Sequence, residues 1–354
     1  MARYPRASQQ PNVTDQTGTY VQGQSSATSG NTYAGTAALV NVVPGVAGVD
    51  VTGIENTAYG VNALNALTTS SYNTAVGYNA LQFGNPDHCV AVGYDALRAC
   101  TTGFRNVGIG THALDNTTSG GENTAVGDTT LAANTTGVEN TAIGTYAIHA
   151  NTTGRENVGI GYFALYTTVT GNYNVAVGVG ALGAQDGTAD NLGIGYYAGG
   201  AVTTAASSVF LGSSAGNKPN NVAGNATTTG TRQTCVGYQT GQGSATQRTD
   251  IVAVGWRAVV DGNGAIAIGA STNAGAHGAV AIGQDHTGAA ASTTTQNVIA
   301  LGTALHQLQL KNNTTGAGSA ALGANSPAIT NTAPYTWIKM MSSDGSTVYV
   351  PCWK

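Results

Sequence analysis

Apolar residues alternate with polar or small ones in short stretches that recur along this chain. The segments "NVGIG", "NTAVG", "NTAIG", "NVGIG" and "NVAVG" begin at Asn106, Asn123, Asn140, Asn157 and Asn174, so that the asparagines keep a constant 17-residue period. Alternation with a period of two, carried by Val, Ile and Thr, is typical of a β-strand. The pattern therefore predicts one short strand at each recurrence.

The recurrence continues on both sides of this region. Units open at Asn56, Asn73, Asn106, Asn123, Asn140, Asn157, Asn174 and Asn191, and a degenerate unit, "CVAVGYDAL", opens at Cys89. A shorter, 14-residue period follows later, because "AIAIGASTNAGAHG" starts at Ala265 and "AVAIGQDHTGAAAS" at Ala279. A fixed short period predicts a solenoid in which coils stack with parallel strand pairing. We expect an all-β roll of about fifteen coils.

Two further elements recur within a unit. "NTTG", as in Asn134–Gly137, is a turn sequence, and a second apolar pair is expected to form a short strand on the opposite wall: Ala80-Leu81, Ala96-Leu97, Ala113-Leu114, Ala164-Leu165 and Ala181-Leu182. The Val and Ile positions, such as Ile143, are expected to face the coil interior. The Ala and Gly positions are then expected on the outside, where three rolls would pack side by side.

Composition excludes several partners. Only 8% of the 354 residues are charged, the formal net charge is −4, and no cluster of Lys or Arg occurs, which argues against binding nucleic acid or an anionic membrane. The chain contains no run of 18 apolar residues, so no membrane span is expected. The first residues lack the apolar core of a signal peptide. We therefore expect a chain that matures in the cytoplasm.

The repeats carry a resemblance to known proteins. "GAIAIGASTNAGAHGAVAIGQD" closely resembles the head repeat of YadA-type trimeric autotransporter adhesins, and the "NTAVGYNAL" and "NTTG" units resemble repeats of bacteriophage tail fibres and other fibrous virion proteins. The resemblance covers roughly residues 51 to 330. It implies a left-handed parallel β-roll, assembled as a homotrimer.

The resemblance also implies a function and a division of the chain. We expect a structural virion protein, a trimeric fibre or spike for host-surface attachment; a capsid decoration protein, such as a head fibre or cement protein, is the alternative. A cellular trimeric adhesin is disfavoured, since neither a signal peptide nor four membrane-anchor strands are recognised. The expected segments are 1–50 for virion attachment, 51–216 with 17-residue coils, 217–250 as an irregular insertion with one coil, 251–330 with 14-residue coils, and 331–354 as a C-terminal hairpin cap around Asp344-Gly345.

No residue pattern predicts catalysis, a cofactor or a metal centre. Glu122, Glu139 and Glu156 recur at one position and are expected to form a solvated edge beside Arg105 and Arg155, with a cation site as the alternative. The six histidines lack metal-ligand spacing, and the one metal hypothesis is an ion on a trimer axis. Cys89 and Cys100 are expected as buried thiols, with a disulfide as the alternative. The candidate glycan-facing side chains are the tyrosines that follow the strand glycine: Tyr78, Tyr94, Tyr162, Tyr196 and Tyr238.

Overall fold

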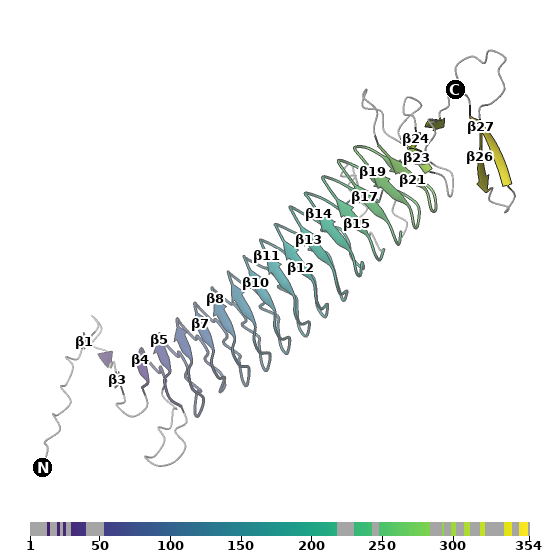
Figure 1. Cartoon of the computed structure of the whole chain (residues 1–354). Helices are drawn as coiled ribbons and strands as arrows, with labels where there is room; N and C mark the ends of the chain where they lie inside the picture. Colours follow the sequence, from purple (N-terminus) through teal and green to yellow (C-terminus); the bar gives the residue numbers. More distant parts are fainter. Residues whose placement is uncertain are drawn as a thin grey trace, which may run out of the picture.

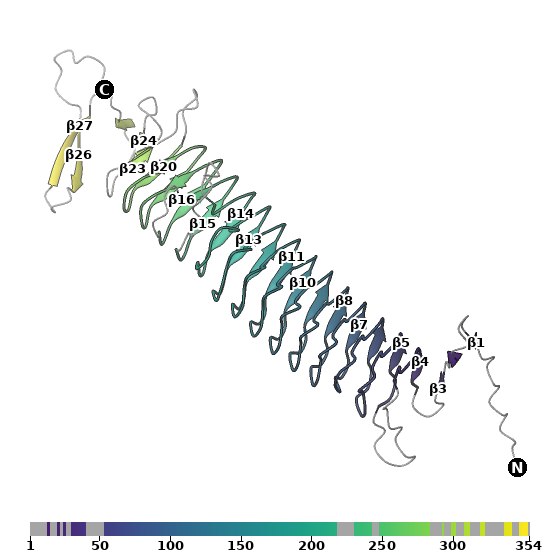
Figure 2. The same ribbon diagram turned by 180° about the vertical axis from the view of Figure 1, so that it is seen from behind.

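The computed structural model describes residues 30–39, 53–217, 230–242 and 248–283, together with strand segments outside these ranges. These residues form an all-β parallel solenoid of about 12 turns, which advances along one axis from β5 at one end to β21 at the other (Figure 1; Figure 2). Within the described part of the chain there is no helix that could cross a membrane.

A single parallel ladder runs the length of the solenoid, and each turn contributes one short strand. Its members are β4 (Thr32–Ala34), β5 (Thr57–Tyr59), β6 (Thr74–Val76), β7 (Val90–Val92), β8 (Val107–Ile109), β9 (Thr124–Val126), β10 (Thr141–Ile143), β11 (Val158–Ile160), β12 (Val175–Val177), β13 (Leu192–Ile194), β14 (Val209–Leu211), β15 (Thr234–Val236), β17 (Val252–Val254), β19 (Ile266–Ile268), β21 (Val280–Ile282) and β23 (Ile299–Leu301). The first and last of these strands belong to turns that are only partly described.

The register of the ladder confirms the periods expected from the sequence. Thr141 pairs with Val158, one 17-residue period later, and Ile266 pairs with Val280, one 14-residue period later. The degenerate unit at Cys89 supplies β7, which pairs with β6 and β8. The polar insertion after Gly216 does not interrupt the ladder, because β14 pairs directly with β15.

Shorter pairings complete the described structure. β1 (Val13–Thr14) pairs antiparallel with β2 (Tyr20–Val21), β3 (Gln24–Ser25) with β4, β24 (Leu308–Lys311) with β25 (Ser319–Leu322), and β26 (Thr336–Met341) with β27 (Thr347–Cys352). A second parallel ladder contains β16 (Gly241–Gln242), β18 (Val259–Val260), β20 (Asn273–Ala274) and β22 (Ser292–Thr293). The expected turn at Asp344-Gly345 lies outside the described residues.

The second short strand expected in every unit is wrong for the 17-residue turns. There the Ala-Leu pairs lie in turns, and their leucines adopt left-handed backbone angles, such as a φ of 51° at Leu165. Leu165 and its equivalents are nevertheless fully buried and do form the wall opposite the ladder. Among the described residues a second strand is present in the later turns, as β16, β18, β20 and β22, of which β18 and β20 belong to the 14-residue turns.

The expected orientation of the ladder strands is also wrong. Ala142, at the centre of β10, is fully buried, whereas Ile143 is 40% exposed, and the other turns repeat this pattern. The reason is the space left by the opposite wall, since a Cβ placed on Gly159 would lie 2.5 Å from Cγ1 of Ile148. The interior therefore admits Ala or Gly beside each Leu or Ile, and the Val/Ile stripe faces outward.

The asparagine that opens each unit is fully buried and links three successive turns. The Nδ2 of Asn140 donates to Oδ1 of Asn123 at 3.0 Å and to the Gly154 carbonyl at 2.8 Å. The Oδ1 of Asn140 accepts from the backbone N–H and the side chain of Asn157, both at 3.0 Å. These contacts recur from Asn56 to Asn191, so that the column forms a continuous hydrogen-bonded ladder except at Cys89.

The glycine that ends each ladder strand is required for close stacking. Gly161 has a φ of 128°, and a Cβ on it would lie 2.7 Å from the carbonyl carbon and oxygen of Gly178 in the next turn. No side chain fits between two backbones at that distance. The stacking of one coil on the next thus explains why Asn and Gly recur at a regular spacing in the sequence.

We predict that Asn140→Ala destabilises the fold by roughly 2–4 kcal/mol, because the Asn157 N–H and the Gly154 carbonyl lose buried partners. The matched control is Asn172→Ala, the same chemical change at an exposed contact to the Arg155 N–H. Urea titration followed by circular dichroism measures both variants. Equal free energies of unfolding for the two would contradict a stabilising role for the ladder.

A candidate ligand-binding surface

The five tyrosines singled out by sequence occupy one position of the turn, immediately after the strand-end glycine. Their exposed fractions lie between 46% for Tyr78 and 58% for Tyr196. Tyr78 and Tyr94 are in neighbouring turns and stack with their ring centroids 5.4 Å apart. Between Tyr94 and Tyr162 the same position holds Thr111, Asp128 and Thr145, so the column is not a continuous aromatic row.

A second aromatic column, which the sequence interpretation missed, lies one residue further along the turn. It contains Tyr146, Phe163 and Tyr197, and the rings of Tyr146 and Phe163 stack at 5.3 Å. Tyr166 packs edge-on against Phe163 at 4.5 Å, and His149 stacks on Tyr166 at 5.3 Å. The signal was present in the 17-residue alignment, because 146, 163 and 197 are equivalent positions and so are 149 and 166.

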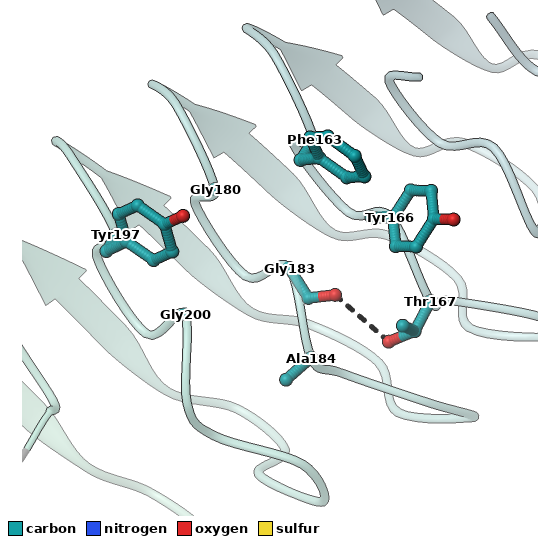
Figure 3. Close-up of a pocket in the computed structure, with 8 residues that line it drawn as sticks. All are labelled: Phe163, Tyr166, Thr167, Gly180, Gly183, Ala184, Tyr197 and Gly200. Carbon is teal, nitrogen blue, oxygen red and sulfur yellow. Dashed lines mark hydrogen bonds between the residues drawn. The ribbon is translucent and has the colours of Figure 1, made fainter. Parts of the chain in front are cut away.

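Tyr146, Phe163 and Tyr197, with His149 and Tyr166 beside them, form an aromatic ridge, and a glycine interrupts it. Gly180 occupies the turn between those of Phe163 and Tyr197, and Gly183 is the equivalent of Tyr166. A pocket of about 240 Å³ lies there, lined by Phe163, Tyr166, Thr167, Gly180, Gly183, Ala184, Tyr197 and Gly200. In Figure 3 the three aromatic rings surround the bare backbone of Gly180 and Gly183.

Backbone geometry does not require glycine at position 180. Its φ of 63° is close to the 58° of Phe163 and the 50° of Tyr197, so this position is left-handed in turns that carry side chains as well. A Cβ on Gly180 would instead lie 2.9 Å from Cε1 of Tyr197. The missing side chain is thus a feature of the surface, because the ring of Tyr197 lies over the Gly180 backbone and takes the place of a side chain there.

His149 is the histidine of this ridge and is half-buried between rings. Tyr166 stacks on it, and Tyr146 meets it edge-on at 5.5 Å. Burial disfavours the charged imidazolium and lowers the pKa of His149 below its usual range. The ridge is therefore uncharged at neutral pH around the pocket, and its polar groups are hydroxyls and backbone amides.

Charged groups gather elsewhere on the solenoid. Arg98 pairs through Nε with Oδ1 of Asp115 at 2.9 Å, and Nδ1 of His112 lies 3.2 Å from the other carboxylate oxygen. Hydrogen bonding to Asp115 raises the pKa of Arg98. Within the described residues no group of three or more His, Cys, Asp or Glu side chains could hold a metal ion.

The glutamate column behaves as a solvated edge. Glu122, Glu139 and Glu156 are exposed, and Nη1 of Arg105, at the equivalent position one turn earlier, lies 2.8 Å from Oε1 of Glu122. Arg232 and Asp250 form a similar exposed pair, in which Nη2 lies 2.9 Å from Oδ2. Such pairs relieve like-charge stacking but contribute little stability.

Cys89 and Cys100 are free, fully buried thiols. Cys89 replaces an asparagine of the ladder, and its Sγ accepts the Asn106 N–H at 3.4 Å. A hydrogen bond to Cys89, together with burial, raises the pKa of Cys100. Cys235 is also a free buried thiol, and burial raises its pKa to about 12. These cysteines act as core residues.

Comparison with known proteins identifies no relative of this chain. No protein-family model, curated protein or solved structure matches the chain. The site must therefore be interpreted from its own geometry: an edge of the solenoid that carries two aromatic columns and one neutral pocket.

We predict that the ring of His149 titrates below pH 6.5, the usual midpoint for histidine. The folded state then binds fewer protons than the unfolded state, so the contribution of His149 to stability is complete above about pH 6.5 and falls as the pH drops toward its folded pKa. NMR titration of the ring protons measures the midpoint. Tyr166→Ala should return it toward 6.5, and a midpoint above 6.5 in the unaltered chain would contradict the burial argument.

Proposed function

We propose that this chain is a structural protein of a bacteriophage virion, a homotrimeric fibre or spike that projects from the particle and mediates attachment to the host surface. The observation that carries the proposal is the apolar outer face of the ladder. The repeats' resemblance to fibrous virion proteins supplies the biological setting, including the left-handed coil and the trimer.

The outer face presents two columns of apolar and β-branched side chains. In nine of the described ladder strands the third residue is exposed by more than a third of its surface: Tyr59, Val76, Ile109, Ile143, Ile160, Ile194, Leu211, Ile268 and Ile282. The first residue, such as Val158 or Val175, is half-buried. The resulting stripe follows the whole ladder and is longer than the apolar patches that soluble monomers usually leave exposed.

Self-association is the simplest way to cover such a stripe. Every turn contributes the same kind of side chain at the same spacing, so a second copy laid alongside in register meets an equivalent surface at every turn. Three copies around one axis would bury the stripe of each chain in a common core. The aromatic edge then stays on the outside of the fibre, where it can contact a host.

Paired substitutions distinguish the coil interior from the proposed interface. We predict that Ile143→Asp with Ile160→Asp leaves a folded coil but lowers the mass in solution from that of a trimer, because the carboxylates would repel across the axis. Ala142→Asp should instead prevent folding, since it places a charge inside the coil. Light scattering and circular dichroism measure these outcomes. A monomeric unaltered chain contradicts the trimer.

The virion location is tested on particles. Antibodies raised against the recombinant chain should label virus particles purified from cells that produce it, as seen by electron microscopy. Label at the tail supports a fibre or spike, whereas label over the shell replaces it with the alternative of a capsid decoration protein. Purified particles that carry no label contradict a virion protein. The free trimer should also compete with particles for adsorption to host cells.

A further inference from the structure

The gap in the aromatic ridge has the shape of a binding slot. Successive turns of a parallel ladder lie about 4.8 Å apart, so Phe163 and Tyr197, two turns apart, leave roughly 10 Å between their backbones. Gly180 supplies no side chain to fill the turn between them. The ring of Tyr197 lies over the Gly180 backbone, and the pocket that remains is bounded by this ring, Phe163 and Tyr166 (Figure 3).

The chemistry of the slot is apolar and uncharged, with hydroxyl groups beside it. Phe163, Tyr166 and Tyr197 present aromatic rings, and no charged side chain lines the pocket. The Thr167 hydroxyl hydrogen-bonds the carbonyls of Gly183 at 3.0 Å and Gln185 at 2.8 Å, which leaves its oxygen lone pairs as acceptors. An anionic ligand would find no cation here.

We propose that this slot binds a neutral pyranose unit of a host-surface glycan. A pyranose has an apolar C–H face that packs on aromatic rings and hydroxyls at its edge that exchange hydrogen bonds with neighbouring hydroxyls and carbonyls. A pocket of about 240 Å³ is below the size range of pockets for drug-sized ligands and suits one sugar ring. This inference rests on the proposed role in host attachment and names the class of receptor for that role.

The slot differs from the tyrosine column expected from the sequence. Tyr162 and Tyr196 flank it, since Tyr162 meets Phe163 edge-on at 4.2 Å and Tyr196 meets Tyr197 at 4.7 Å. They pack against Phe163 and Tyr197 but do not line the pocket. The sugar is held by the second column and by Tyr166.

Saturation-transfer NMR on the full-length chain tests the inference. The probes are methyl α-glucopyranoside, methyl β-galactopyranoside and N-acetylglucosamine, with N-acetylneuraminic acid as the charged comparison. We expect saturation transfer to at least one neutral sugar and weaker transfer to the anionic one. No transfer to any neutral sugar overturns the proposal.

Two variants locate the binding. Gly180→Asn places a side chain where the Tyr197 ring now lies and so closes the slot. Asparagine is tolerated by the backbone, because Asn62 and Asn79 occupy the equivalent position and are also left-handed. Phe163→Ser removes one wall and uses the residue found at the equivalent Ser214. Each should weaken sugar binding at least tenfold, whereas Thr129→Asn, at the equivalent position three turns before Gly180, should leave it unchanged. Equal binding by Gly180→Asn and the unaltered chain overturns the proposal.

The trimer proposal and the sugar-binding proposal are tested by different measurements, so one can be wrong while the other holds. If Gly180→Asn lowers the mass in solution, a neighbouring copy occupies the slot and the sugar proposal is wrong. Light scattering of the unaltered chain and antibody labelling of particles use no sugar. A labelled, trimeric protein that binds no neutral sugar would therefore remove only the slot and would retain the proposed virion role.

Discussion

Hydrogen bonding between equivalent residues of successive turns is the constraint on which the rest of this structure depends. Each ladder asparagine accepts from the backbone of the next turn and donates to the previous one, as Asn123, Asn140 and Asn157 do. A residue in a solenoid therefore has its own equivalents as neighbours above and below, and it must be compatible with them. Two turns that lack the asparagine retain an acceptor, because Cys89 Sγ and Ser208 Oγ each accept the backbone N–H of the following turn.

The same constraint separates the chain into positions that are fixed and positions that are free. Strand-end glycines are fixed, because backbone meets backbone at Gly161 and Gly178. The second residue after the strand-end glycine, such as Phe163, has a left-handed φ. In other turns Asn, Asp, His, Thr and Ser adopt the same φ at this position. Their side chains leave the stack, so one can be changed without changing the coil. A single glycine among aromatic equivalents, as at position 180, then alters the surface without altering the fold.

The sequence was sufficient for the repeat, the parallel ladder and the shortening of the period toward the C-terminal end, because these depend on spacing alone. It was not sufficient for the direction in which the strands face. Alternation in "NTAIG" is the same whichever side is buried, and the choice is made by Ile148 and Leu165, which fill the coil so completely that only Ala142 or Gly159 fits beside them. Five candidate tyrosines are exposed as required, but the pocket lies in the neighbouring column. The alignment places Phe163, Gly180 and Tyr197 in one column, but it does not show that their side chains and Tyr166 enclose a pocket, which depends on how the rings lie in the folded turns.

The change of period toward the C-terminal end distinguishes the role of the coil interior from that of the outer face of the ladder. In the turns that begin at Ile251 and Ala265 these two buried apolar residues stand in place of the ladder asparagine. Val260 and Ala274, on the second ladder of the same turns, are also buried. The outer face of the ladder nevertheless stays apolar through Ile268 and Ile282. If that face were only a by-product of filling the coil, it should change when the filling changes. Its persistence across two kinds of turn is what the proposed assembly surface requires, and it leaves the residues that follow the strand-end glycines as the part of the solenoid surface that can vary.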